Sequence, residues 1–571
     1  MPLDGVTPDM PLEDFIMSPY TAAFIIRSND YENLDIRDNP YVRVAKTLSG
    51  DFVVCYARID LFDDLLRDSN IFHKSLSLGP LSQLDLEASS IVTLHNQPYV
   101  SLKGNGALLG FVDTGIDYTK PAFCWKSGET KIKYLWDQSV AGVPPRNYNY
   151  GTEYDSNRIN EALNSQNPNE IVPQTDKSGH GTFLASVACS HENGTYMGAA
   201  PEAELIVVRL RKASSFYMAW GVIQSDTEEV YEAADLMMGV EYIIERAHEL
   251  GRPVVICIAL GTNLTGHDGF NVMDDYLTGI SYQNGVCVCC AVGNEADKRH
   301  HASGVIEGVG ESKSLEITVG EDSPSFIFSV WNNFSDRMSV SITSPLGEVI
   351  ARVPPRSGTT NVSRLIMEQA VVNITYIFPF SGNSSQVTDV KIVNPTPGIW
   401  KLTVYGDIIL DGTFDIWLPL TGLVGSDIAF LSPSTECSVT APATALGVIS
   451  VGAYNSKDKS IYASSSIGPT RSGKTAPDLI APGVDVGGIF PDSYGVMTGT
   501  SVACAIVAGA CALLMQWGLV EGNTPSMNTY YIKTLLIQGC DRDANIKYPH
   551  PQYGYGRLNL YNTFLQMRSN W

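Results

Sequence analysis

The stretch ALLGFVDTGIDY, residues 107–118, decides the fold, because a continuous apolar run there ends abruptly at an acid and a turn. A run of this length without polar alternation is typical of a strand that is buried on both faces of a sheet. Asp113 ends the run, and Thr114 and Gly115 indicate the turn that follows. Functional side chains gather at the carboxyl ends of the strands in such sheets. The sequence therefore places Asp113 where chemistry is expected.

Strand-like and helix-like runs alternate on either side of this stretch, from about residue 100 to 300 and again after 436. This alternation predicts an α/β fold, with a parallel sheet in the middle layer and helices on both faces. Strands are expected at AELIVVRL (203–210), PVVICIALG (253–261), GVCVCCAVGN (285–294) and GVISVGAY (447–454), and helices at 179–190, 230–250 and from Ser501.

Two flanking segments have a different pattern. In the opening segment, FVVCYARI (52–59) predicts a strand and DLFDDLLRDS (60–69) an amphipathic helix, which together fit a small α+β unit. From about 303, short β-type runs separated by Gly, Pro, Asn and Ser indicate an inserted all-β sandwich of the jelly-roll kind. The predicted division is 1–85, 86–302, 303–435 and 436–571.

The composition is that of a large, acidic, folded protein. The 571 residues are 44% hydrophobic and 17% charged, which supports an extensive core and argues against disorder. The net charge of -23 argues against nucleic acid and anionic membranes as partners. An acidic surface favours either basic substrates or simply solubility.

Targeting and metal signals are weak. Residues 1–20 contain no basic segment followed by an apolar run, so we expect no signal peptide. The longest apolar run, residues 504–517, is short for a membrane span. Cys287, Cys289 and Cys290 lie in a predicted buried strand, and no partner ligands recur at zinc-site spacings. We therefore expect no membrane span, no metal, and free thiols in a reducing compartment.

Amide hydrolysis by serine needs a nucleophile, a base, a group that orients the base, and donors for the oxyanion. Asp113 could accept a proton from an imidazole. Asp117 is a competing acid in the same stretch, and a plain turn acid is the structural alternative; the strand delivers Asp113 more directly. His180 lies in SGHGT, where small neighbours leave the ring accessible, and it is one of only nine histidines.

The remaining two groups come from the second half of the fold. Ser501, in TGTSVACAIVAGACALL, begins a predicted helix, whose N-terminal N–H groups and dipole favour a developing oxyanion. A simple helix cap is the alternative for this serine. Asn294 follows a buried strand, and its amide could complete an oxyanion hole, although an asparagine there is usually a turn residue.

The order Asp, His, Asn, Ser, with these flanks, resembles the subtilase family of serine proteases. Its motifs look like Asp-Thr-Gly, His-Gly-Thr, a Gly-Asn pair and Gly-Thr-Ser. The resemblance covers about 85–300 and 436–565, and three further segments support it. They are GAAPEAELIVVRL (198–210), ASSSIGPTRSGKTAPDLIAPG (463–483) and YGYGRLNLYNTF (553–564).

The resemblance implies a role for each residue. Asp113 would orient the base, His180 would be the base, and Ser501 the nucleophile. Asn294 and the Ser501 N–H would form the oxyanion hole. Residues 259–261, that is Ala259, Leu260 and Gly261, would line the substrate cleft by β-pairing.

The sequence differs from the family pattern after the serine, and it does not define ligands at a turn where some relatives bind calcium. Cys504-Ala505 replaces the Ser-Pro pair of many members, which is expected to alter helix packing and not the nucleophile. The turn at 190–198 stands where some relatives hold calcium. No ligand can be assigned there, so calcium stays unassigned and no cofactor is predicted.

A finer resemblance is to the clostridial Csp germination proteases. It implies a retained prodomain at 1–85 that acts as chaperone and inhibitor, with its tail in the cleft and cut by the enzyme itself. The predicted cut is at Gln83–Leu84. The implied protein substrate is a zymogen, in particular a spore cortex-lytic hydrolase, and the implied location is intracellular or spore-associated. The alternatives are a catalytically silent sensor or scaffold, and a general intracellular subtilase.

Overall fold

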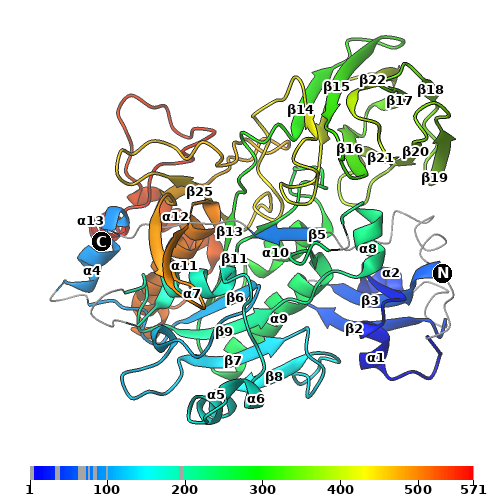
Figure 1. Cartoon of the computed structure of the whole chain (residues 1–571). Coiled ribbons are helices and arrows are strands. Elements are labelled where there is room, and N and C mark those ends of the chain that lie inside the picture. Colours follow the sequence, from blue (N-terminus) through cyan, green and yellow to red (C-terminus); the bar gives the residue numbers. More distant parts are fainter. Residues whose placement is uncertain are drawn as a thin grey trace.

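The computed structural model shows three parts: a central α/β unit, a β-sandwich built from the middle of the chain, and a small N-terminal sheet (Figure 1). The structure describes residues 6–32, 39–49, 51–61, 73–74, 77–80, 87–97, 101–191, 197–224 and 226–569.

An eight-stranded sheet forms the middle layer of the central unit, in the order β26-β25-β13-β11-β6-β9-β7-β8. All neighbouring strands in it pair in parallel except β7 and β8, which confirms the predicted parallel sheet. The strand that ends at Asp113 is β6, inside the sheet between β11 and β9. The bounds are β6 (Leu108–Asp113), β7 (Ile132–Asp137), β8 (Thr152–Asp155), β9 (Glu204–Arg209), β11 (Val254–Ile258), β13 (Val286–Ala291), β25 (Ile449–Tyr454) and β26 (Leu479–Pro482).

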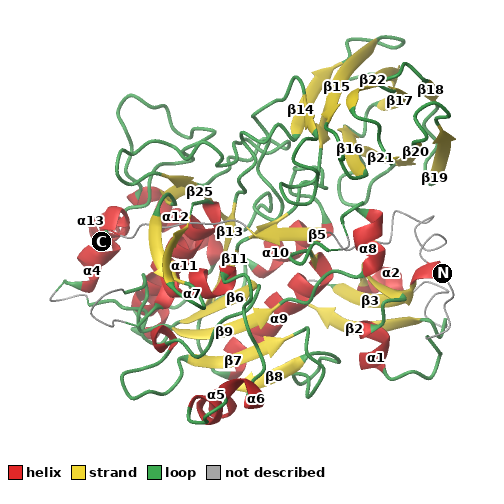
Figure 2. Cartoon of the chain, in the orientation of Figure 1, coloured by secondary structure: helices red, strands yellow, loops and turns green. Residues whose placement is uncertain are grey.

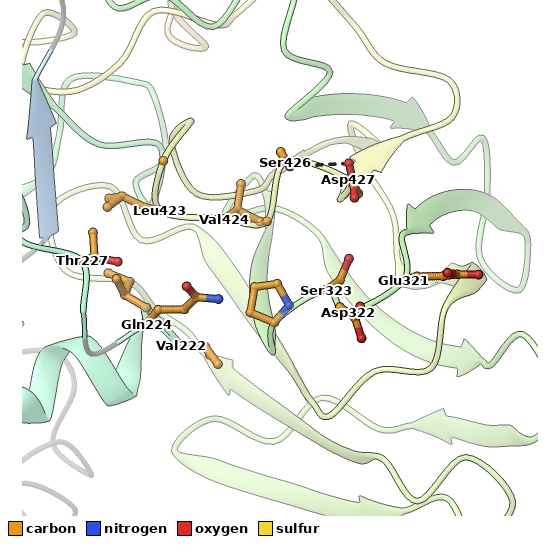
Figure 3. A pocket seen from close by; sticks show the side chains of 14 residues that line it. Val222, Gln224, Thr227, Glu321, Asp322, Ser323, Leu423, Val424, Ser426 and Asp427 are labelled. Atoms are coloured by element: carbon orange, nitrogen blue, oxygen red, sulfur yellow. Dashed lines mark hydrogen bonds between the residues drawn. The ribbon is translucent and has the colours of Figure 1, made fainter.

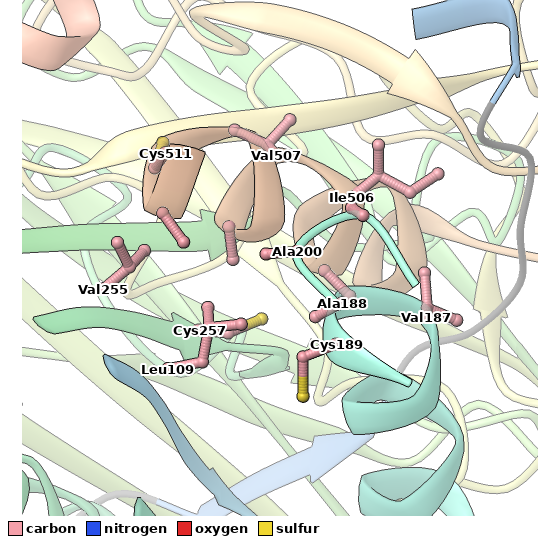
Figure 4. Packing of buried hydrophobic residues seen from close by; sticks show 14 of the residues in the cluster. Leu109, Val187, Ala188, Cys189, Ala200, Val255, Cys257, Ile506, Val507 and Cys511 are labelled. Carbon is pink, nitrogen blue, oxygen red and sulfur yellow. The ribbon is translucent and has the colours of Figure 1, made fainter. Parts of the chain in front are cut away.

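Helices cover both faces of this sheet (Figure 2), which explains why its strands are apolar throughout. Along β6, Leu109 (Figure 4) and Phe111 belong to the core cluster that contains α7 and α11, whereas Leu108 and Val112 belong to the cluster that contains α9 and α10. The helices are α7 (His180–Cys189), α11 (Thr500–Met515) and α12 (Thr529–Gly539) on the first face, and α9 (Ala233–Glu249) and α10 (Val272–Ile280) on the second.

One helix in the described part of the chain has the length and apolar character of a membrane span. It is the continuous helix Thr500–Val520, which contains α11, and 89% of its most apolar window is buried inside the protein. Both faces of α11 are needed for packing, since every one of its residues is buried. Its burial is that of a core helix.

The inserted all-β domain forms two antiparallel sheets, in the orders β14-β23-β16-β21-β20-β19 and β18-β17-β22-β15-β24. Side chains from both sheets share one apolar core. The jelly-roll topology stays a prediction. The strands are β14 (His301–Val305), β15 (Ser312–Val319), β16 (Phe326–Asn332), β17 (Arg337–Thr343), β18 (Val349–Val353), β19 (Thr359–Arg364), β20 (Val371–Ile377), β21 (Gln386–Val393), β22 (Gly398–Ile408), β23 (Thr413–Trp417) and β24 (Ala429–Phe430).

The N-terminal sheet packs on the central unit through α9. Its strand order is β2-β3-β1-β4, all antiparallel, and Ile25 and Tyr56 join the core cluster beneath α9. The strand predicted at 52–59 is β3, whereas most of the helix predicted at 60–69 lies outside the described residues. The elements are α1 (Leu12–Met17), β1 (Thr21–Arg27), α2 (Ser28–Glu32), β2 (Val42–Leu48), β3 (Phe52–Arg58) and β4 (His73–Lys74).

Shorter elements complete the surface. Helix α4 packs against α13 at the C-terminal end of the chain, as seen in Figure 1. The remaining helices and strands are α4 (Ile91–His95), α5 (Ser156–Leu163), α6 (Pro168–Ile171), α8 (Ser215–Trp220), α13 (Leu560–Ser569) and the hairpin β27 (Val486–Ile489) with β28 (Tyr494–Met497).

Candidate active site

Asp113 and His180 meet at the carboxyl end of β6. Asp113 is the last residue of β6 and His180 the first of α7, and His180 Nδ1 lies 2.6 Å from Asp113 Oδ1. The Thr114 N–H donates to the same carboxylate oxygen at 2.8 Å. An Nδ1–H that donates to Asp113 makes Nε2 the acceptor nitrogen of a neutral imidazole. The pair can therefore act as a base together with the group that orients it.

Glycines on both sides of His180 allow this close approach. A Cβ at Gly181 would lie 2.2 Å from the carbonyl oxygen of Gly115, so any side chain there would push α7 away from β6. Gly179 has φ +78°, in the left-handed region, and a Cβ there would also meet Phe490. The small neighbours of His180 are thus required by the backbone, a reason that the sequence alone did not reveal.

The competing acid, Asp117, is placed elsewhere. Its carboxylate accepts from the Thr119 N–H and hydroxyl and pairs with Lys120 Nζ at 3.2 Å. The structure thus brings Asp113, and not Asp117, against His180.

Ser501 lies in the first turn of α11, and its Oγ donates to the carbonyl oxygen of Ala259 at 3.4 Å. Strands β6 and β11 are adjacent and parallel, with Phe111 opposite Cys257. The same register carried two residues further puts Asp113 opposite Ala259, just past the end of β11. Ser501 therefore reaches the sheet edge that also carries the Asp113–His180 pair.

Asn294 is held in one orientation by Thr500, a residue that the sequence analysis did not single out. The Thr500 N–H and hydroxyl donate to Asn294 Oδ1 at 3.0 and 3.3 Å, and the Thr500 hydroxyl accepts from the Gly293 N–H at 3.1 Å. With Oδ1 occupied in this way, the Nδ2 amide is the donor that Asn294 can offer to a substrate carbonyl. The signal in the sequence was the threonine directly before the serine.

Asp176 is a second residue that the sequence analysis missed. Its Oδ1 accepts from the Thr114 hydroxyl at 2.8 Å and the Gly179 N–H at 2.9 Å. Its Oδ2 accepts from the Thr182 N–H at 2.8 Å and hydroxyl at 2.7 Å. Asp176 is 3% exposed, so it ties the end of β6 to both sides of His180 from inside the protein. An acid four positions before the histidine was the available signal.

Leu260 and Gly261 form β12 (Leu260–Gly261), an outer strand of a three-stranded sheet whose other outer strand is β10 (Tyr231–Glu232). Strand β5 (Ser77–Pro80) lies between them and pairs antiparallel with both. Pro80 is opposite Leu260, so the chain direction in β5 leads toward Ala259. Figure 1 shows β5 apart from the other N-terminal strands, next to the central unit. The predicted cut, at Gln83 and Leu84, lies outside the described residues.

A buried polar cluster joins the N-terminal sheet to β10. Arg211 donates to Asp235 Oδ2 at 2.8 Å and to the Ile16 carbonyl at 2.7 Å, and also contacts the Tyr56 hydroxyl. Glu232, at the end of β10, accepts from the Ser214 N–H at 2.8 Å. Burial and the nearby Asp235 raise the pKa of Glu232 to about 7.

A separate surface pocket of about 300 Å³ opens where the loop before β10 meets two loops of the sandwich (Figure 3). None of the predicted site residues is among its described lining residues. They are Val222, Ile223, Gln224, Thr227, residues 321–324 and residues 422–427. The turn at 190–198, considered for calcium, lies largely outside the described residues.

Comparison with known proteins gives concordant matches. A family model described as the subtilase family matches residues 104–345 and 428–556. The structure of the CspB protease of Clostridium perfringens aligns with a TM-score of 0.75 and 30% identity, and covers 85% of this chain and 97% of that one.

Two sequence matches are shorter. Serine protease AprX of Bacillus subtilis strain 168 is 32% identical over 151 residues, which is 22% of this chain and 31% of that protein. The thermophilic serine proteinase of Bacillus sp. strain AK1 is 35% identical over 122 residues, 21% of this chain and 26% of that protein. The chain thus spans less than a third of the length of either relative.

Proposed function

The chain belongs to the subtilase family of serine proteases, and we propose that Ser501 is its nucleophile, His180 its general base and Asp113 the group that orients the base. The observation that carries this assignment is the 2.6 Å contact between His180 Nδ1 and Asp113 Oδ1. It lies at the end of the sheet where Ser501, on α11, donates to the Ala259 carbonyl. A catalytic triad of this kind is recognised by the geometry and the roles of its three side chains, and not by their positions in the sequence.

The proposed reaction follows from these positions. His180 Nε2 takes the proton of Ser501 Oγ as the oxygen attacks the substrate carbonyl carbon, and Asp113 stabilises the imidazolium that forms. The negative carbonyl oxygen is met by the Asn294 amide and the Ser501 N–H at the start of α11. The imidazolium then protonates the leaving amine, which leaves an acyl-enzyme. Water, activated by the same histidine, hydrolyses the acyl-enzyme and restores Ser501.

The arrangement of β10 and β12 suits an endopeptidase, because these strands pair with the middle of an extended chain and not with a chain end. Strands β12 and β10 each pair with an extended segment through backbone hydrogen bonds, a mode that tolerates many side chains. The occupant in this structure is β5 of the chain itself. Its direction toward Ala259 supports self-cleavage just beyond Pro80, for which we retain the bond Gln83–Leu84.

For the physiological substrate we propose a protein zymogen, of the spore cortex-lytic class that is activated during germination, and an intracellular or spore-associated location. The similarity to the CspB protease over nearly its whole length supports this choice over a general intracellular subtilase. The prodomain, residues 1–85, would act as a chaperone and as an inhibitor bound in the cleft.

One observation favours the alternative of a catalytically silent sensor. Ser501 has no exposed surface while β5 lies in the cleft, so intact catalytic groups could stay closed to other proteins. The two proposals differ in what happens after self-cleavage: an enzyme opens to substrate, and a sensor does not.

The test is purification of the wild-type chain and the Ser501→Ala variant, with Ser493→Ala as a control at an exposed serine nearby. We expect the wild type and the control to yield two fragments, with a new N-terminus near Leu84, and Ser501→Ala to stay whole. Maturation of Ser501→Ala without added protease would overturn the triad. A processed wild type that a fluorophosphonate fails to label at Ser501 would favour the sensor.

A further inference from the structure

Three cysteine side chains converge in the core between the central sheet and α11. Cys287 and Cys289 alternate with Val288 on β13, so both point to the face that α11 covers, and Cys511 points back at them from the helix. Their sulfur atoms all lie within 4.8 Å of one another, and Cys289 Sγ is 3.8 Å from Cys511 Sγ. None of the three has exposed surface. Figure 4 shows Cys511 on the helix above the strands.

We propose that Cys287, Cys289 and Cys511 form a three-sulfur site for a thiophilic metal ion of the Cu(I) class. The spacing of the sulfurs carries the proposal. Metal–thiolate bonds are about 2.3 Å long, so three sulfurs in a plane around one ion are about 4 Å apart. The 3.8 Å separation of the Cys289 and Cys511 sulfurs already matches that arrangement, and the third sulfur lies within 4.8 Å of both.

The ligand set selects the metal. Thiolates favour soft ions such as Cu(I), whereas magnesium and calcium require oxygen ligands. Structural zinc is almost always four-coordinate, and among the described residues the group contains three cysteines and no fourth ligand of the His, Cys, Asp or Glu type. A three-sulfur site therefore fits Cu(I) better than zinc. No metal was expected from the sequence, because no partner ligands recur at zinc-site spacings; Cys511 lies far along the chain from the other two cysteines.

Binding of Cu(I) would displace the thiol protons of the three cysteines to solvent, because the thiolate is the form that ligates a metal.

A second cysteine pair in the same layer provides an internal comparison. Cys257 on β11 and Cys504 on α11 have their sulfurs 3.7 Å apart and are just as buried, but within the described part of the chain no third ligand completes a group with this pair. If buried cysteines here act only as small apolar side chains, both sets should behave alike. A metal site should distinguish them.

The three-cysteine site lies between two elements that also carry proposed catalytic residues. Strand β13 leads to Asn294, and α11 begins at Thr500 and carries Ser501, so an ion bound by Cys289 and Cys511 would link the two elements that hold the nucleophile and the oxyanion asparagine. We expect metal binding to raise the melting temperature, because the ion binds the folded chain and not the unfolded one.

The experiment uses the full chain in a Ser501→Ala background, which separates metal binding from proteolysis. Because the sulfurs are buried, the ion must be present as the chain folds, so cells are grown with copper and the protein is purified under reducing, oxygen-free conditions. Copper is measured by mass spectrometry, and its retention against bicinchoninate is followed. Cys511→Ser and Cys289→Ser test the site, and Cys257→Ser and Cys504→Ser are the matched controls.

We expect about one copper per chain in the parent and in both controls, at least a tenfold lower content in Cys511→Ser and Cys289→Ser, and a higher melting temperature with copper only where it is retained. Cadmium supplied in place of copper should give a sulfur-to-metal ultraviolet band with the same dependence. Parent protein with no bound copper, equal loss in the control variants, or a disulfide between Cys289 and Cys511 would each overturn the proposal. Should Cys511→Ser fail to fold, Cys289→Ser decides.

Discussion

Replacement of Asp176 by asparagine should disturb the position of His180 while leaving the side chains of Asp113, His180 and Ser501 chemically unchanged. The carboxylate accepts four hydrogen bonds, two on each oxygen, and two of the donors are the backbone N–H groups of Gly179 and Thr182. An amide of the same shape has one oxygen and one NH2 group. Whichever way it turns, one of these two N–H groups faces a donor and loses its partner.

The expected magnitude follows from this count. A buried donor left without an acceptor costs about 1–3 kcal/mol, and hydrogen bonds to a charged group are at the upper end. The lost hydrogen bond is that of the Gly179 or the Thr182 N–H, on either side of His180. We expect the backbone there to shift in search of another acceptor, and the His180 imidazole to move with it. A displacement near 1 Å can reduce turnover about a hundredfold. We therefore expect kcat to fall roughly tenfold to a hundredfold in Asp176→Asn, with a smaller change in KM.

The assay is the rate of fluorophosphonate labelling of Ser501, together with the rate of self-cleavage and the melting temperature. Asp117→Asn is the matched control: it makes the same chemical change in the same region, at a partly exposed acid that pairs with Lys120. We expect the control to label and melt like the wild type. Wild-type labelling in Asp176→Asn, or an equal loss in both variants, would refute the positioning role.

Three other outcomes are expected. Asn294→Ala should slow self-cleavage about 10²–10³-fold without a large change in melting temperature, because one oxyanion donor is lost; fragment yield over time measures this. The raised pKa of Glu232, about 7 against an ordinary value near 4.3, comes from burial and from Asp235 in the central unit, so the folded chain holds a proton that the unfolded chain releases. The contribution of Glu232 to the free energy of unfolding should thus be greatest below pH 4.3 and fall by about 1.4 kcal/mol per pH unit up to about 7, a trend that Glu232→Gln should remove from the pH dependence of the melting temperature. Trp417→Ala should cost about 3–5 kcal/mol and lower the melting temperature, since Trp417 stacks between His267 and His301, at 4.1 and 4.8 Å, where the sandwich meets the central unit.

The central sheet was predictable because its strands are covered on both faces, which forces apolar residues at successive positions. Strand β6 shows this directly, with Leu108 and Leu109 in different core clusters. The pairing of Asp113 with His180 could be expected because a buried strand delivers the acid to the end of the sheet and the order of the motifs resembles that of subtilases. The close approach that the flanking glycines permit was evident only in the structure.

Other features could not be predicted because they depend on contacts between distant segments. Residues 77–80 carry no pattern that marks them as an occupant of the cleft, since backbone pairing with β10 and β12 makes few demands on side chains. Asp176 and Thr500 are a common acid and a common hydroxyl, and only their partners give them a role. Cys511 meets Cys287 and Cys289 only through the packing of α11 on β13.

The register between β6 and β11 connects these observations. With Phe111 opposite Cys257, the position of Asp113 is level with Ala259, which directly precedes β12 and whose carbonyl oxygen accepts from the Ser501 hydroxyl. A shift by one residue would turn Asp113 to the other face of the sheet, away from α7, and would leave His180 without its carboxylate. The apolar residues of β6 and β11, buried against α9 on one face and α11 on the other, fix this register. The geometry of the proposed catalytic groups is therefore set by the same core packing that stabilises the sheet. Substitutions deep in that core should for this reason alter the labelling of Ser501 before they unfold the protein.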